Sequence, residues 1–280
     1  MALPSQFLPA SFSLGAVGVW GTSDFLGGYA ARRSNAFVFT TVVHASGLLV
    51  MSGTALAAHS PFPSGMGIGW ALAAGLSGGA GLAVFYRALA SGRMGLTAPV
   101  AAVLSAAIPT LFALFTEGVP HALQVSGFIL AAIGIWLISR AEDGSRPQGI
   151  STAIVAGIAF AGFYLFMKQA GDGSALWLAA ISRIASFVFT GAIVLFARNY
   201  QITRQGLGIG VVAGVLDIAG SVMFIRACQT GRLDAAVVIS SLYPAITVLL
   251  ARLFLKEHFT RWKMVGMLAA LMAVPLIAGR

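Results

Sequence analysis

The chain has 280 residues, of which 58% are hydrophobic and only 9% are charged, and its mean hydropathy is +0.91. So much apolar surface cannot be hidden inside a water-soluble globule, which excludes that class of protein. The net charge of +9 does not indicate a nucleic-acid partner, because the seventeen Lys and Arg residues are scattered singly between apolar runs. We therefore predict an all-α integral membrane protein in contact with the lipid bilayer.

The apolar residues fall into ten stretches of the length that a membrane-spanning helix needs, which is about 20 residues. The first stretch has no basic residue before it, so we expect a retained helix and not a cleaved signal peptide. The ten predicted spans are residues 11–30, 37–58, 67–90, 95–115, 121–138, 150–169, 175–197, 206–227, 235–255 and 262–278.

An internal repeat relates the two halves of the chain at a shift of 139 residues: FYRALASGR at 85–93 returns as FIRACQTGR at 224–232. The polar segment SRAEDGSRPQG falls at the expected join, so the predicted units are residues 1–138 and 150–280 with residues 139–149 as a linker. Because each half holds five helices, an odd number, the second half enters the membrane from the opposite face. The sequence thus predicts two inverted-topology repeats, which are typical of secondary transporters with a binding site between the halves.

The positive charges predict an orientation. Twelve Lys and Arg residues lie beside the connections after the first, third, fifth, seventh and ninth spans, against four on the other face. The positive-inside rule places the first face in the cytoplasm and both termini outside.

Two acidic residues, Asp24 and Asp217, lie well inside predicted spans. An ionisable group at membrane depth is costly unless it meets a cavity or a partner, so both are candidate substrate-binding residues. Arg183 and His44 occupy equivalent positions of the repeat and are also candidate substrate-binding residues. The Arg183 guanidinium is suited to bind a carboxylate, and the His44 imidazole can titrate near neutral pH. Structural alternatives stay open for both: Asp217 pairs with Arg183 or with hydroxyls of a neighbouring helix, and His44 only fills a packing position.

Aromatic and hydroxyl side chains complete the candidate site. They can form an aromatic wall or offer ring faces to a cation, although core packing explains them equally well. Prolines inside three spans are expected to interrupt them, and the sequence SLYPA makes the ninth span a candidate cavity wall. The aromatic candidates are Trp20, Tyr86, Tyr164 and Tyr243, the SLYPA candidates are Ser241 and Pro244, and the other span prolines are Pro99, Pro109 and Pro275.

The sequence indicates no cofactor and no metal site. It holds no Walker-type or HExxH motif, and the lone Cys228 excludes an intrachain disulfide and a multi-cysteine site. The run GLSG at 75–78 is similar to the nucleophile motif of intramembrane serine proteases, with Ser77 as the nucleophile. No histidine stands out as its base, and the repeat replaces the motif by GVLD, so an intramembrane enzyme is the less favoured class.

Three segments taken in order resemble EamA-type members of the drug/metabolite transporter superfamily: WGTSDFLGGYAARR at 20–33, FYRALASGRMGLTAPVAAVLSA at 85–106 and SSLYPAITVLLARLFLKE at 240–257. The resemblance covers nearly the whole chain. It implies a ten-helix exporter of amino acids or related metabolites in the bacterial inner membrane, with Glu117 and Glu257 as the acidic residues that close the fourth and ninth spans. It also implies cytoplasmic termini, the reverse of the orientation that the charges predict.

These observations predict a secondary transporter that exports a small zwitterion, specifically an amino acid, by alternating access. Arg183 would hold the substrate carboxylate, and Asp217 or Asp24 the ammonium group. The substrate side chain would lie against Trp20, Tyr164 and Tyr243. One acid shared with protons would couple export to the proton gradient. The alternative is efflux of organic cations, including paraquat-like compounds, in which Arg183 has no role. A chain with both halves is expected to act as a monomer.

Overall fold

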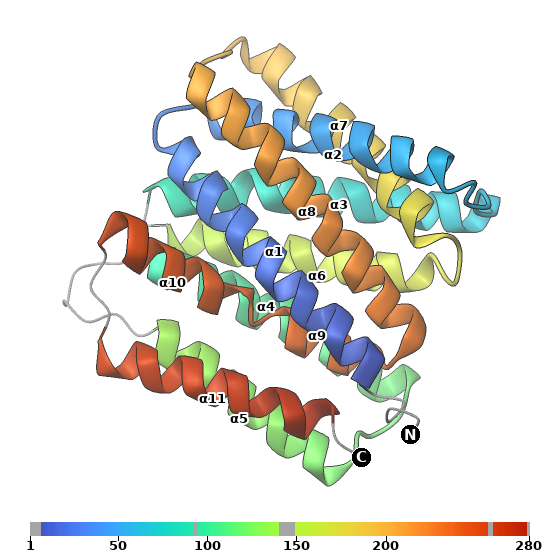
Figure 1. Ribbon diagram of the computed structural model, residues 1–280, viewed down its shortest axis with the longest axis vertical. Helices are drawn as coiled ribbons and strands as arrows, with labels where there is room; N and C mark the ends of the chain where they lie inside the picture. Colours follow the sequence, from blue (N-terminus) through green and yellow to red (C-terminus); the bar gives the residue numbers. More distant parts are fainter. Residues whose placement is uncertain (1–6, 92–93, 140–148, 257–259, 279–280) are drawn as a thin grey trace.

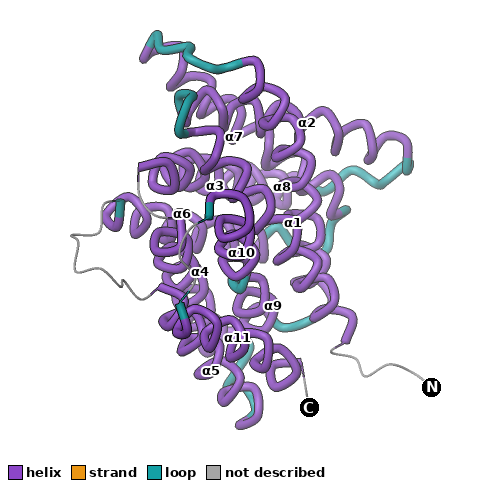
Figure 2. The backbone as a smooth tube through the Cα atoms, turned by 60° about the vertical axis from the view of Figure 1, so that its left-hand side comes forward, coloured by secondary structure: helices purple, strands orange, loops and turns teal. Residues whose placement is uncertain are grey.

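The computed structural model describes residues 7–91, 94–139, 149–256 and 260–278, and over these residues the backbone is helical with no strand (Figures 1 and 2). Six segments are long and apolar enough to cross a membrane, with α9 and α10 counted as one. The helices of the described residues are α1 (Phe7–Ala31), α2 (Ala36–Ala57), α3 (Gly65–Ser91), α4 (Met94–Thr116), α5 (Ala122–Ser139), α6 (Ile150–Gln169), α7 (Ala175–Ala197), α8 (Arg204–Thr230), α9 (Leu233–Ser240), α10 (Tyr243–Leu255) and α11 (Arg261–Ala278).

The predicted spans and the observed helices differ mainly at one place, where the ninth span is broken into α9 and α10. Ser241 and Leu242 separate the two helices, and Pro244 lies in the first turn of α10. Proline has no N–H and its ring clashes with the carbonyl one turn back, so a break here follows from the sequence.

The expected interruptions at the other prolines were wrong. Helix α4 continues through Pro99 and Pro109, and α11 continues through Pro275. A proline removes a single backbone hydrogen bond, and packed neighbouring helices can hold the rest of the helix together. The predicted linker lies largely outside the described residues, as do Arg93, Arg140, Arg146 and Glu257.

Helices from the two halves of the chain pack against each other in matching pairs. Helix α1 lies along α8, α3 lies along α6, and α2 lies along α7 (Figure 1). Glycine makes these approaches possible: a side chain at Gly75 of α3 would strike the backbone of Ser182 in α7. At the position shifted by 139, a side chain at Gly214 of α8 would strike the backbone of Val43 in α2. Small residues bring helix backbones close in membrane proteins, which have no hydrophobic drive between helices.

Helices α5 and α11 form a pair at the edge of the bundle (Figure 1). They meet at Gly127, where a side chain would strike Leu276 and Ile277, and the Gln124 side chain donates a hydrogen bond to the Ile277 carbonyl at 3.3 Å. Their outer faces carry exposed apolar side chains such as Ile129 and Leu268. An apolar outer surface is what contact with lipid requires.

Candidate functional site

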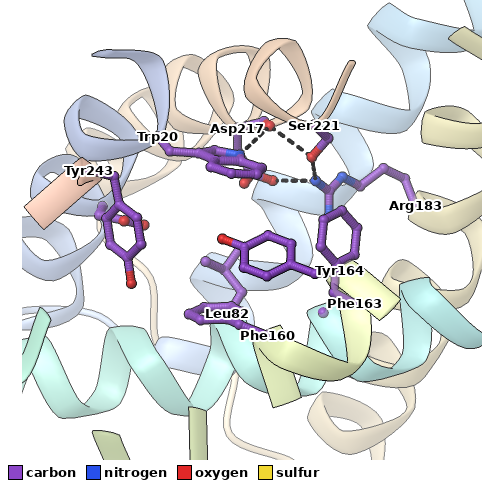
Figure 3. A pocket seen from close by; sticks show the side chains of 11 residues that line it. Trp20, Leu82, Phe160, Phe163, Tyr164, Arg183, Asp217, Ser221 and Tyr243 are labelled. Carbon is purple, nitrogen blue, oxygen red and sulfur yellow. Dashed lines mark hydrogen bonds and ion pairs between the residues drawn. The ribbon is translucent and has the colours of Figure 1, made fainter. Parts of the chain in front are cut away.

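A cavity lies among helices from both halves of the chain. Its volume, counted as the space that the centre of a water molecule can occupy, is about 50 Å³. One water needs roughly 10–15 Å³ on that measure, so the cavity admits a few waters, and an amino acid requires the helices to move apart. The lining residues are Trp20, Asp24, Gly78, Leu82, Phe160, Phe163, Tyr164, Arg183, Asp217, Ser221 and Tyr243 (Figure 3).

An ion pair joins α7 to α8 on one side of the cavity. Nη2 of Arg183 lies 2.8 Å from Oδ2 of Asp217, and the same nitrogen donates a hydrogen bond to the Ser221 hydroxyl at 2.7 Å (Figure 3). The contact with Asp217 is an ion pair and not an aligned hydrogen bond, because no N–H points at Oδ2. The Ser221 hydroxyl in turn donates to the backbone carbonyl of Asp217 at 3.1 Å. The guanidinium is therefore held against α8.

The Asp24 carboxylate makes no hydrogen bond or ion pair within the described part of the chain, although the residue is only 7% exposed. Asp217 is near enough to act on it electrostatically. With both carboxylates ionised, two negative charges and the single positive charge of Arg183 leave a net charge of −1 on the lining. A buried carboxylate is stable only with a partner, so Asp24 is suited to a cation or a proton.

Aromatic rings form the wall between α1 and α6. The Tyr164 ring lies 6.0 Å from Trp20 and 4.6 Å from Phe224, measured between centroids. The Trp20 indole N–H donates to the Asp217 carbonyl at 3.1 Å, which fixes the ring beside the ion pair. The Tyr243 hydroxyl is buried and has no hydrogen-bond partner among the described residues. Rings with a few polar atoms among them are typical of small-molecule sites.

The structure brings six of the ten predicted site residues to the cavity: Trp20, Asp24, Tyr164, Arg183, Asp217 and Tyr243. The other four lie outside its lining. Tyr86 is fully buried with its hydroxyl 3.3 Å from that of Ser23. His44 is also fully buried, within electrostatic range of Arg183, and neither ring nitrogen has a well-aligned hydrogen bond within the described chain. Ser241 and Pro244 belong to the junction of α9 and α10.

Five lining residues were not predicted. Leu82, Phe160 and Phe163 are apolar residues in apolar helices, so nothing in the sequence distinguishes them from packing residues. Gly78 leaves room for the Phe163 ring, which a Cβ atom at that position would approach to 2.9 Å. Ser221 could have been found, because it follows Asp217 by four residues and therefore shares its helix face.

Ser77, the nucleophile of the less favoured enzyme hypothesis, has a structural partner. The Ser77 hydroxyl donates to the backbone carbonyl of Ala159 at 2.7 Å, where it joins α3 to α6. Within the described residues, no group of three or more His, Cys, Asp or Glu side chains is placed to hold a metal ion.

Comparison with known proteins gives three findings. Residues 147–279 match the EamA-like transporter family. The chain is 31% identical over 134 residues to the uncharacterized protein MJ1333.1 of Methanocaldococcus jannaschii, across 46% of this chain and 98% of that protein. A solved crystal structure is similar over 96% of this chain and 94% of its own chain, with a TM-score of 0.74 and 16% sequence identity.

At that identity the crystal structure shows the fold alone, and the family match supplies the biochemical class. A transporter family points away from the intramembrane enzyme and agrees with a multi-pass helical chain. The chain belongs to the EamA-like transporter family of the drug/metabolite transporter superfamily.

Proposed function

We propose that this protein is a secondary transporter that exports a small amino acid or related metabolite by alternating access, across a bacterial inner membrane. The observation that carries the proposal is the central cavity, which combines a carboxylate without a partner, a buried guanidinium and an aromatic wall. Such a site matches the ammonium, the carboxylate and the apolar part of an amino acid.

Two inverted five-helix repeats, residues 1–138 and 150–280, form the transport unit in this proposal. Equivalent contacts support it: Gly75 meets Ser182 as Gly214 meets Val43, with each pair related by a shift of 139. The colours of Figure 1 also show that α1 and α6, the first helices of the two halves, run in opposite directions. The family match begins at residue 147, and MJ1333.1 is matched almost throughout by about half of this chain. Both facts support a half-length unit.

Asp24 receives the substrate ammonium group in this mechanism, since it is the lining carboxylate without a partner. The substrate carboxylate binds the Arg183 guanidinium in place of the Asp217 carboxylate. The released Asp217 then has Trp20 and Ser221 beside it. Proton uptake by a carboxylate left without its cation would offset its burial and couple export to the proton gradient.

Reconstitution in liposomes tests the substrate class. Liposomes that contain the purified protein should take up or release labelled amino acids. Liposomes with the double variant Arg183→Gln/Asp217→Asn should lose that activity. The double variant keeps the charge of the pair balanced, so its folding is not burdened by an unpaired ion. Transport of no amino acid by the wild type, tested across small, aromatic and sulfur-containing substrates, would remove this substrate class.

A second candidate is efflux of organic cations. One observation favours it: Arg183 is already paired with Asp217, so the remaining charge of the lining is the carboxylate of Asp24 among aromatic rings. A cation exporter should keep its activity in Arg183→Gln/Asp217→Asn and lose it in Asp24→Asn. An amino acid exporter should lose activity in both.

A further inference from the structure

The start of α9 is tied to the end of α4 by a cluster of charged groups at one end of the bundle. We infer that α9 is a hinged gate at one end of the cavity, and that Glu117, Lys168 and Arg232 form the latch that keeps this gate closed. The inference rests on the proposed function in that a gate presupposes transport, but the evidence for it lies outside the substrate site.

The Glu117 carboxylate joins three elements. Its Oε1 atom lies 3.0 Å from Nζ of Lys168 at the end of α6, and its Oε2 atom accepts the backbone N–H of Leu233 at 2.9 Å. Leu233 is the first residue of α9, so its N–H has no acceptor within that helix. The ion pair with Lys168 is partly exposed and contributes little alone, whereas the bond to the helix terminus adds charge assistance.

Arg232 binds the same place from the other side. Its guanidinium donates to the backbone carbonyls of Glu117 at 2.9 Å and Gly118 at 2.8 Å. It also donates to the buried Asp234 carboxylate at 2.7 Å, and this hydrogen bond raises the pKa of Arg232 above its ordinary value, so the side chain stays charged. Residues adjoining α4 and α9 therefore hold each other through several converging bonds and not through one surface ion pair.

The latch lies just beyond one end of the cavity. Lys168 follows Tyr164 by four residues, or about 6 Å along α6, and its Nζ atom also donates to the Cys228 carbonyl of α8 at 3.3 Å. Between the latch and the ion pair of the cavity, the Phe224 ring contacts the Trp20 ring in a tilted arrangement, with 5.8 Å between centroids. Aromatic rings and then charged groups thus close the cavity at this end. It is the end of the bundle where α1 begins, since Gly231, next to Arg232, lies against Pro9.

At its other end, α9 meets α10 at a break in the helix where a backbone hydrogen bond is missing. Ser241 and Leu242 interrupt the helix, and Pro244 has no N–H to offer the Ser240 carbonyl. The hydroxyls of Ser240 and Tyr243 are buried and have no hydrogen-bond partner in the described part of the chain. Buried hydroxyls without partners are costly, and a second position of α9 that supplies partners accounts for them.

All eight residues of α9 are buried, so the helix is a wall of the protein and not a surface turn. A short rigid segment with a joint at one end and a latch at the other has two available positions once the latch opens. A purely structural clamp, by contrast, would leave a single position whether or not the latch is present.

Pulsed electron paramagnetic resonance separates these two cases without any substrate. Spin labels are placed at two exposed positions, Thr230→Cys, two residues before Arg232, and His121→Cys, four residues after Glu117, in a Cys228→Ala background that removes the native cysteine. Glu117→Ala removes both carboxylate bonds and should raise the ratio of the long-distance to the short-distance population about tenfold. Glu117→Gln retains an acceptor for the Leu233 N–H and should raise it about threefold.

The matched control is Arg226→Gln, which removes an exposed guanidinium whose hydrogen bond among the described residues is to the Gln229 side chain, and it should leave the distances unchanged. Unchanged distances in both folded Glu117 variants would overturn the gate, as would an equal shift in the control. If Glu117→Ala does not fold, Glu117→Gln and Lys168→Gln decide the question alone. Failure of amino acid transport in liposomes would leave these distances unaffected, so the two proposals fail separately.

Discussion

Arg183 of α7 and Asp217 of α8 form a buried ion pair, with 2.8 Å between Nη2 and Oδ2 and side chains that are 5% and 10% exposed. The pair neutralises two charges that would each be costly at membrane depth. It also means that neither residue is free for a substrate until the pair opens. The energy of the pair is thus part of the energy of substrate binding.

Single substitutions in this pair should destabilise the protein more than the double substitution. Arg183→Gln or Asp217→Asn leaves one buried charge without its partner, which costs about 3–5 kcal/mol. Arg183→Gln/Asp217→Asn removes both charges and should recover most of that loss. Thermal unfolding of the four proteins in the same detergent measures this double-mutant cycle, and additive losses would show that the residues are not coupled.

Asp24→Asn should weaken substrate binding without weakening the fold. The carboxylate makes no bond within the described residues, so its neutralisation removes a desolvation cost and should leave the melting temperature unchanged or higher. The loss of a charged partner for a substrate cation should reduce affinity by about ten- to a hundredfold. Binding to the purified variant measures this, with the exposed Asp172→Asn as the control. A lower melting temperature with unchanged affinity would assign Asp24 a structural role.

The all-α membrane class and the helix ranges could be predicted from the sequence, because span length and hydropathy are set by the thickness of a bilayer. The charged part of the site could be predicted for a related reason: Asp24, Arg183 and Asp217 stand out against apolar surroundings. Leu82, Phe160 and Phe163 could not, since an apolar residue that faces a cavity looks the same in the sequence as one that faces lipid. The continuity of α4 through Pro109 also depends on neighbouring helices, which the local sequence does not contain.

Close approach between the halves should depend on two equivalent glycines. Gly75→Ala and Gly214→Ala each place a methyl group against the backbone of the facing helix, at Ser182 or Val43. Neither backbone can yield without shifting its helix, so each variant should lose about 1–3 kcal/mol of stability. Melting temperatures in one detergent measure the effect.

The matched controls for these variants are Gly69→Ala and Gly208→Ala, which lie in the same two helices, are also related by a shift of 139, and face open space within 4 Å. Alanine favours a helix over glycine, so the controls should be neutral or slightly stabilising. Equal losses at all four positions would contradict the interpretation that Gly75 and Gly214 are contact positions.

Pro244→Ala should slow transport and spare binding. Alanine at this position has a backbone N–H that can donate to the Ser240 carbonyl, which proline cannot do. The added hydrogen bond favours one continuous helix through Ser241 and Leu242 and stiffens the joint between α9 and α10. Because the cavity volume of about 50 Å³ requires helices to move before a substrate enters, a stiffer joint should reduce the transport rate several-fold. Pro109→Ala is the control, since α4 already continues through that proline. Rates in liposomes and affinities in detergent separate the two effects, and equal slowing by both variants would show that the break itself has no special part in the motion.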